Sequence, residues 1–222
     1  MKETLKTLVD IHDGNKYFIS KELKVLSEMS KEDLDAKIIK FKYVFVADNP
    51  GEEEIADKEN VIYLNSNGQA GKNFENFLKW LGIERKDCMI MNKTIKHTKL
   101  TENLGDDLDW NSQSEVAYVI NEIIKVNPSI KVCLLGFTDF YNTNDKSLFR
   151  DFYSKLNGND CFRAYHHPSR RQLFTLSEQK EIEEADIDKI EYFDFVGKEQ
   201  FKDRKKENNN YLKRYKDSQG GA

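Results

Sequence analysis

The sequence predicts an α/β protein with a three-layer αβα architecture, in which a central sheet of four parallel strands lies between two layers of helices. Two observations predict this class. Short apolar runs that are typical of strands, at residues 42–47, 88–92, 131–135 and 161–165, alternate with segments whose apolar residues follow helical spacing. Polar residues follow the ends of these runs. This alternation indicates βαβ units with right-handed crossovers, which build a parallel sheet.

The composition is that of a globular chain with a polar surface. Of the 222 residues, 38% are hydrophobic and 33% are charged, enough for one full-sized core. No apolar run approaches the roughly 20 residues that span a bilayer. The N-terminus shows no signal-peptide pattern, so we expect a cytoplasmic monomer without membrane contact. The three cysteines are far apart, which predicts buried free thiols. They form no Cys-x-x-Cys pair, so the sequence gives little support for a zinc ribbon or a thiolate-bound metal cluster.

The helical segments are expected in order along the chain. Residues 1–40 form an N-terminal helical layer, in which Ser30 is a candidate N-cap. Residues 61–64 are either an edge strand or a loop tucked into the core. A helix that opens at Gly68 has one apolar face and ends at Gly82. Further helices are expected near 116–124, 145–156 and 177–195. We expect one domain over 1–195, followed by a charged helical or disordered tail over 196–222.

Net charge gives little indication of a nucleic-acid partner. The formal charge is −4, yet basic residues gather in three places, each of which is either a binding patch or ordinary solvated surface. These are Lys93, Lys96, His97 and Lys99; Arg163, His166, His167, Arg170 and Arg171; and the tail from Lys202 to Lys216.

Polar residues follow three of the predicted strands. Asp48 and Asn49 follow the first, Asn92 ends the second, and His167 and Ser169 follow the fourth. Taken alone, Asp-Asn-Pro-Gly at 48–51 is an ordinary turn. The carboxyl ends of parallel strands share one edge of the sheet, however, and ligand sites lie there. We therefore expect these side chains to converge on one site.

Five segments give the sequence its resemblance to the uracil-DNA glycosylase superfamily. They stand in the family's order with similar spacing and cover about residues 43–172. The segments are 46–51, 68–74 running into 81–85, 89–92, 134–136 and 167–169. The set is most similar to the family-4-like branch, although Asn-Pro-Gly at 49–51 also resembles the single-strand-selective and mismatch-specific branches.

The resemblance implies a uracil-DNA glycosylase-like fold and a monofunctional DNA glycosylase. Such an enzyme hydrolyses the N-glycosidic bond of a flipped-out uracil or a bulkier modified pyrimidine. Asp48 would be the catalytic carboxylate and Asn49 would position water. His167 would donate a hydrogen bond to the departing base, as in an oxyanion hole. Asn92 would read the base edge.

The same resemblance places DNA phosphates. Ser169, Arg170 and Arg171 would hold the backbone beside the gap left by the flipped base. Backbone N–H groups around Pro50, Gly51 and Gly68 would take phosphates too. No metal and no cofactor is expected.

The sequence departs from the family-4-like pattern in three respects. The cysteines of the iron–sulfur cluster are missing, so no cluster is expected. Ser66 and Asn67 stand where a stacking Phe is usual. Either the loop is shifted and Tyr63 supplies the aromatic ring, or Ser66 helps to form a wider, more polar base pocket. The Glu residues at 52–54 either point to solvent or read a polar substituent such as a sugar hydroxyl.

Three functions therefore remain open. The first is a DNA glycosylase, in repair or in defence against modified foreign DNA. The second is a catalytically inactive nucleic-acid-binding module of the same fold. The third is another α/β enzyme such as a nucleotide hydrolase, but the sequence has no Gly-rich phosphate loop directly after a strand.

Overall fold

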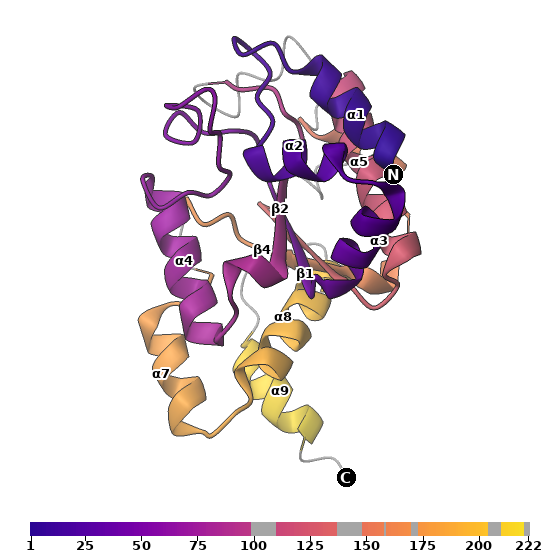
Figure 1. Ribbon diagram of the computed structural model, residues 1–222. Helices are drawn as coiled ribbons and strands as arrows, with labels where there is room; N and C mark the ends of the chain where they lie inside the picture. Colours follow the sequence, from indigo (N-terminus) through magenta and orange to yellow (C-terminus); the bar gives the residue numbers. More distant parts are fainter. Residues whose placement is uncertain (99–109, 137–147, 158, 170–172, 204–209, 220–222) are drawn as a thin grey trace.

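The computed structural model describes residues 1–98, 110–136, 148–157, 159–169, 173–203 and 210–219. A parallel sheet with the strand order β2-β1-β3-β4 lies at its centre (Figure 1). The strands are β1 (Tyr43–Ala47), β2 (Cys88–Asn92), β3 (Lys131–Leu135) and β4 (Phe162–Tyr165). The predicted α/β class and the four parallel strands are confirmed, each strand within one residue of its expected position.

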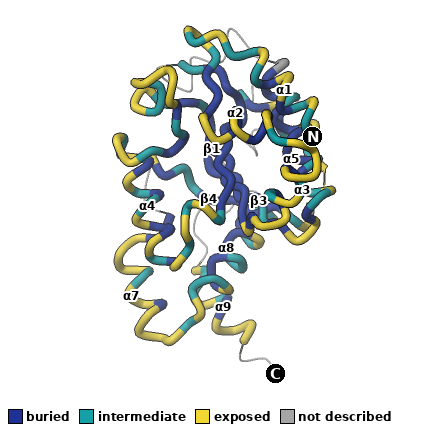
Figure 2. The backbone as a smooth tube through the Cα atoms, in the orientation of Figure 1, coloured by how far each residue is buried: buried dark blue, intermediate teal, exposed yellow. Residues whose placement is uncertain are grey.

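Helices cover both faces of the sheet, which gives the three expected layers (Figure 1). The first layer contains α1 (Lys2–Ile11), α3 (Lys31–Lys40), α5 (Trp110–Val126) and α6 (Arg150–Lys155), with α2 (Lys21–Glu28) packed against α1. The other contains α4 (Gln69–Leu81) and α8 (Lys189–Asp203), with α7 (Leu176–Glu184) and α9 (Tyr211–Gln219) farther out. Figure 2 shows the strands as the most deeply buried part of the chain and α7 and α9 as largely exposed.

Local sequence explains where several helices begin and end. Ser30 caps α3, since its hydroxyl accepts the backbone N–H of Asp33. Helix α4 buries the expected face of Phe74, Phe77, Leu78 and Leu81. The helix ends at Gly82, which adopts a left-handed conformation with φ 70°, as a glycine at the C-terminus of a helix commonly does.

Residues 61–64 form a loop in the core, and not an edge strand. Val61, Tyr63 and Leu64 are each 1% exposed. The loop is held by Arg85, whose guanidinium donates to the carbonyls of Tyr63 at 2.5 Å and Leu64 at 3.1 Å. Of the two alternatives that the sequence allows, the buried loop is therefore the one observed.

Helix α8 runs across the boundary expected at residue 195. The ring of Phe193 stacks on Tyr165 of β4 with centroids 4.4 Å apart, and Val196 is buried. A Cβ at Gly197 would lie only 2.1 Å from the Tyr165 hydroxyl, so this glycine allows α8 to pack closely on β4. The covering layer therefore continues beyond residue 195.

None of the helices in the described part of the chain is long and apolar enough to cross a membrane. The three cysteines are free, and Cys88 and Cys133 are buried in β2 and β3.

Candidate functional site

Because the four strands are parallel, the polar residues predicted at their carboxyl ends lie along one edge of the sheet. Ala47, which ends β1, is paired with Asn92, which ends β2. The backbone N–H of Lys93 donates to the Ala47 carbonyl at 2.8 Å, and Gly136 after β3 donates to the carbonyl of Tyr165 in β4 at 3.0 Å. The residue after β2 is thus bonded to the end of β1, and the residue after β3 to the end of β4.

Asp48 forms a buried ion pair with Lys93. Asp48 Oδ1 lies 2.5 Å from Lys93 Nζ, and the two residues are 8% and 0% exposed. Lys93 Nζ also donates to the carbonyl oxygens of Leu135 at 2.7 Å and Gly136 at 3.3 Å. A single ammonium group therefore ties together the ends of β1, β2 and β3.

The surroundings of Lys93 keep it charged. Its ammonium lies 4.7 Å from the ring centroid of Phe149 and 5.5 Å from that of Tyr153, both favourable positions for a cation. Burial lowers the pKa of Lys93, but the Asp48 carboxylate and then Tyr153 more than offset this effect, so the pKa lies above its ordinary value. Lys93 therefore neutralises Asp48 and is not a free amine nucleophile.

Gly136 leaves room for the Asp48 carboxylate. It has φ 75°, a left-handed conformation that favours glycine. A Cβ at this position would lie 2.6 Å from Asp48 Oδ1 and 2.8 Å from Oδ2. The glycine after β3 is thus required both by its backbone conformation and by the closeness of Asp48.

Asn92 is a buried amide without hydrogen bonds. It is 1% exposed, and neither Nδ2 nor Oδ1 has a hydrogen-bond partner among the described residues. Buried polar groups are nearly always paired, so such an exception calls for an explanation. Its amide lies close enough to the Glu54 carboxyl to lower the pKa of that group, although not in hydrogen-bonding geometry.

Glu54 turns inward from the acidic run at 52–54. Its carboxylate accepts the backbone N–H of Leu64 at 2.7 Å and that of Gly51 at 3.2 Å. Burial raises the pKa of Glu54 to about 7, against the opposing effects of these hydrogen bonds, Asn92 and Arg85. Of the two orientations considered for this run, Glu52 and Glu53 are exposed, whereas Glu54 faces the protein.

The turn after β1 is attached to the segment after β2. Asn49 Nδ2 donates to the Thr98 carbonyl at 3.3 Å. His97 Nδ1 lies 2.7 Å from the carbonyl oxygen of Pro50. Asn49 and Pro50 thus fix the turn after β1 to the segment after β2. The backbone N–H of Gly51 donates to the Glu54 carboxylate.

His167 lies two residues beyond β4, on a segment anchored to α4. Asn73 Nδ2 of α4 donates to the carbonyl of Pro168 at 2.8 Å. The backbone N–H of Ser169 donates to His167 Nδ1 at 3.2 Å, and the Ser169 hydroxyl lies 2.7 Å from the same nitrogen. Because Nδ1 accepts a hydrogen bond, a neutral His167 carries its proton on Nε2. His167 is therefore arranged as an Nε2–H donor.

The remaining predicted site residues lie in different surroundings. Tyr63 is a core residue whose hydroxyl donates to the Phe18 carbonyl at 2.6 Å. Ser66 is exposed, two residues before Gly68, the residue that precedes α4. Arg170 and Arg171 lie outside the described residues, so their predicted phosphate contacts have no structural counterpart here.

Sequence reasoning missed two residues of this site, Lys93 and Glu54. The sequence places Lys93 in a basic cluster with Lys96, but the two lysines are 0% and 5% exposed, so neither is solvated surface. The only available signal was the position of Lys93 directly after a strand end. Glu54 was visible as part of an acidic run, but nothing in the sequence separated it from its exposed neighbours.

The described residues contain no group of three or more His, Cys, Asp and Glu side chains that could hold a metal ion. In comparisons with known proteins, no family model matches the chain and no curated protein matches it.

These contacts define what the edge can do chemically. It holds a fixed carboxylate with its counterion, an amide whose hydrogen-bonding groups are unused, and a carboxyl group that gains or loses its proton near neutral pH. An amide of this kind can form two hydrogen bonds with a planar ligand that presents a donor beside an acceptor. The edge of a pyrimidine base presents such a pair.

Proposed function

We propose that this protein is a DNA glycosylase that hydrolyses the N-glycosidic bond of a flipped-out uracil or a bulkier modified pyrimidine. The observation that carries the proposal is Asn92, which is fully buried at a strand end and whose side-chain Nδ2 and Oδ1 have no hydrogen-bond partner among the described residues. An unsatisfied buried amide costs roughly 1–3 kcal/mol. A ligand that pairs with the amide recovers that energy, and a pyrimidine edge has the required groups.

The neighbouring residues suit the rest of the reaction. Breaking the glycosidic bond leaves positive charge on the sugar and negative charge on the departing base. Asp48 supplies a carboxylate for the sugar cation, and Asn49 beside it positions water. His167 supplies an Nε2–H that stabilises the base anion. The base must first leave the DNA stack.

Glu54 favours a polar base pocket. It lies close to Asn92 and has a pKa of about 7, so at neutral pH it can either donate or accept a hydrogen bond. Together with exposed Ser66 in place of an aromatic ring, it fits a substrate with a polar substituent. Excision of modified bases in defence against foreign DNA is consistent with this pocket, as is uracil repair.

A catalytically inactive nucleic-acid-binding module is the second candidate. One observation favours it: Lys93 already neutralises the carboxylate assigned to catalysis. In that case the fold would hold an extruded base at Asn92 without cleaving the bond.

Base release tests the proposal directly. Duplex and single-stranded oligonucleotides containing uracil, and heavily modified phage DNA, are incubated with the protein and then treated with alkali to cleave abasic sites. We expect strand breaks with at least one substrate. Binding without abasic sites on any substrate would favour the inactive module.

Two variants separate the roles, with one control. His167→Ala is expected to lower the rate about 10²-fold or more, the usual effect of losing a transition-state donor. Asp48→Asn is expected to abolish base release, and it keeps an oxygen that can accept from Lys93. His12→Ala, which removes a histidine near the end of α1, should leave the rate unchanged. Full activity in both site variants would refute the assignment.

A further inference from the structure

The outer edge of β2 is an unpaired strand edge. In the described part of the sheet β2 pairs only with β1. The carbonyl of Asp87 accepts the N–H of Lys42 at 3.0 Å, and the N–H of Lys93 donates to the carbonyl of Ala47 at 2.8 Å. The backbone N–H and C=O groups of the odd-numbered residues of this strand therefore point toward β1. Backbone groups alternate in direction along a paired strand, and those of Ile90 therefore point away from the sheet. Such an edge is a template for another strand.

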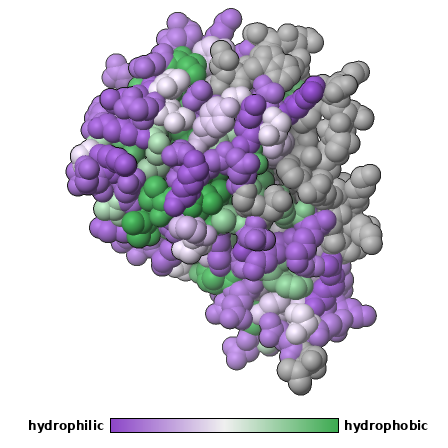
Figure 3. All heavy atoms as spheres, turned by 90° about the vertical axis from the view of Figure 1, so that its right-hand side faces the viewer, coloured by the Kyte–Doolittle hydropathy of each residue, from purple (hydrophilic) through white to green (hydrophobic). Residues whose placement is uncertain are grey.

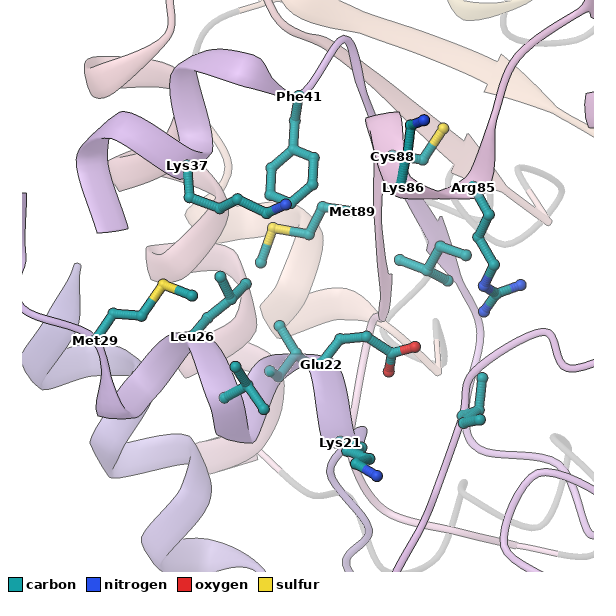
Figure 4. A pocket seen from close by; sticks show the side chains of 14 residues that line it. Lys21, Glu22, Leu26, Met29, Lys37, Phe41, Arg85, Lys86, Cys88 and Met89 are labelled. Atoms are coloured by element: carbon teal, nitrogen blue, oxygen red, sulfur yellow. The ribbon is translucent and has the colours of Figure 1, made fainter. Parts of the chain in front are cut away.

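An apolar groove lies along this edge (Figure 4). It has a volume of about 530 Å³ between α2, the end of α3 and β2. In Figure 4, Leu26 of α2 and Met29, which follows this helix, lie across the space from Phe41 and Met89. Val25, which also lines it, is 47% exposed. Figure 3 shows hydrophobic side chains gathered within a face that is otherwise largely hydrophilic.

The rim of the groove is basic. Its lining contains four cationic residues, Lys21, Lys37, Arg85 and Lys86, and one acidic residue, Glu22. Arg85 is already paired with Glu75 and Lys86 with Glu84, so the positive charge of the rim comes from Lys21 and Lys37, for which no ion pair is found among the described residues. The Lys37 ammonium lies 5.2 Å from the centroid of the Phe41 ring. An occupant with carboxylates at its ends complements this rim. Two copies of this chain would bring two basic rims together, which disfavours self-association through β2.

We propose that this groove binds an extended segment of a partner protein, which adds a strand beside β2. Apolar side chains on one face of the segment fill the groove, and flanking acidic residues meet the basic rim. Main-chain hydrogen bonds to the β2 edge supply affinity, and the side-chain pockets supply selectivity. The surface is separate from the Asp48 and His167 side chains, so this inference does not depend on the glycosylase proposal.

A labelled peptide tests the groove by fluorescence anisotropy with the full chain. The probe has nine residues, valine alternating with threonine over five positions and two glutamates at each end. We expect saturable binding that weakens as salt is raised. Two further peptides control the mode of binding. Exchange of the glutamates for lysines should weaken binding at least tenfold, and so should N-methylation of alternate amides on one edge.

Matched variants locate the site. Val25→Glu and Lys37→Glu should each weaken binding at least tenfold. Ile39→Glu is the control, because Ile39 is 61% exposed on α3, the same helix as Lys37, and does not line the groove. Circular dichroism checks that all three variants are folded before their binding is compared.

Several results would overturn the inference. These are no binding up to 1 mM peptide, equal binding of the lysine-flanked peptide, or equal loss in Ile39→Glu. Sedimentation that shows a dimer disrupted by Val25→Glu would identify a second copy as the occupant instead. Base release by Val25→Glu should match that of the unsubstituted protein, so failure of one proposal leaves the other standing.

Discussion

Replacement of Asn92 by leucine is expected to stabilise the folded protein. The side chain is 1% exposed, and neither of its polar atoms has a hydrogen-bond partner in the described structure. An amide buried in this way costs roughly 1–3 kcal/mol, whereas leucine is favoured by burial. The favourable effect of the amide on Glu54 is lost, which offsets part of the gain. We expect the free energy of unfolding to rise by about 1–2 kcal/mol, a shift in Tm of about 2–8 °C.

Asn127→Leu is the matched control. Asn127 is also buried, at 7% exposed, but its Nδ2 donates to the carbonyls of Ile38 at 3.2 Å and Phe41 at 3.0 Å. The Ser129 hydroxyl donates to its Oδ1 at 2.8 Å. Leucine at 127 leaves these groups unpaired, so the same substitution should cost about 2–4 kcal/mol there.

Urea unfolding followed by tryptophan fluorescence and circular dichroism measures both variants. The reasoning requires opposite signs, a gain for Asn92→Leu and a loss for Asn127→Leu. If Asn92→Leu is destabilised as strongly as Asn127→Leu, Asn92 has a structural partner and is not available to a base. A variant that gains stability and also loses base release would indicate that the amide is kept for ligand binding.

Three further predictions concern the groups around Asn92. Lys93→Met should lower the free energy of unfolding by about 3–5 kcal/mol because it leaves Asp48 buried without its counterion, and the added Asp48→Leu should recover most of the loss in urea titrations. The pKa of Glu54 is about 7 in the folded protein and 4.5 as an ordinary value, so the folded state binds its proton more tightly. The contribution of Glu54 to the free energy of unfolding is therefore fully present below pH 4.5 and is lost as the pH rises through 7. Glu54→Gln should remove this loss, and parallel stability–pH curves for variant and parent would contradict it. Gly136→Ala should cost about 2–4 kcal/mol from its left-handed backbone and its contact with Asp48, whereas Gly82→Ala, with φ 70° and open space around it, should cost only about 1 kcal/mol in the same titration.

The sequence predicted the parts of the fold that depend on local patterns. Strand positions followed from apolar runs bounded by polar residues, and the face of α4 followed from its helical spacing and from Gly82. Beyond residue 195 the sequence predicts a charged helical or disordered tail, and α8 is helical to Asp203. Helix α8 carries many charges, which suggested fraying, yet Phe193 and Val196 are buried and Gly197 allows close contact with β4.

The site was predicted less completely because its electrostatics depends on contacts between distant residues. Asp48, Asn92 and His167 could be placed at strand ends from the chain order alone. The burial of Lys93 could not, because a lysine in a polar loop is normally solvated. Its burial depends on Asp48 and on the carbonyl groups of Leu135, the last residue of β3, and Gly136, which lie 42 to 45 residues away in the chain. The inward turn of Glu54 likewise depends on an N–H from Leu64.

The balance of charge at the strand ends favours a neutral ligand over a phosphate. Asp48 and Lys93 form one neutral ion pair, in which the cation is fully enclosed. Burial raises the pKa of Glu54 to about 7, and a carboxyl group is neutral or negative, so it adds no positive charge. No uncompensated cation therefore stands among these three residues, and a phosphate would meet weak repulsion there. The unused amide of Asn92 is neutral, and a neutral base with donors and acceptors complements it without any cost from charge. Under the proposed glycosylase function, the DNA phosphates would therefore be bound by exposed cations at the rim of the site and not at its centre.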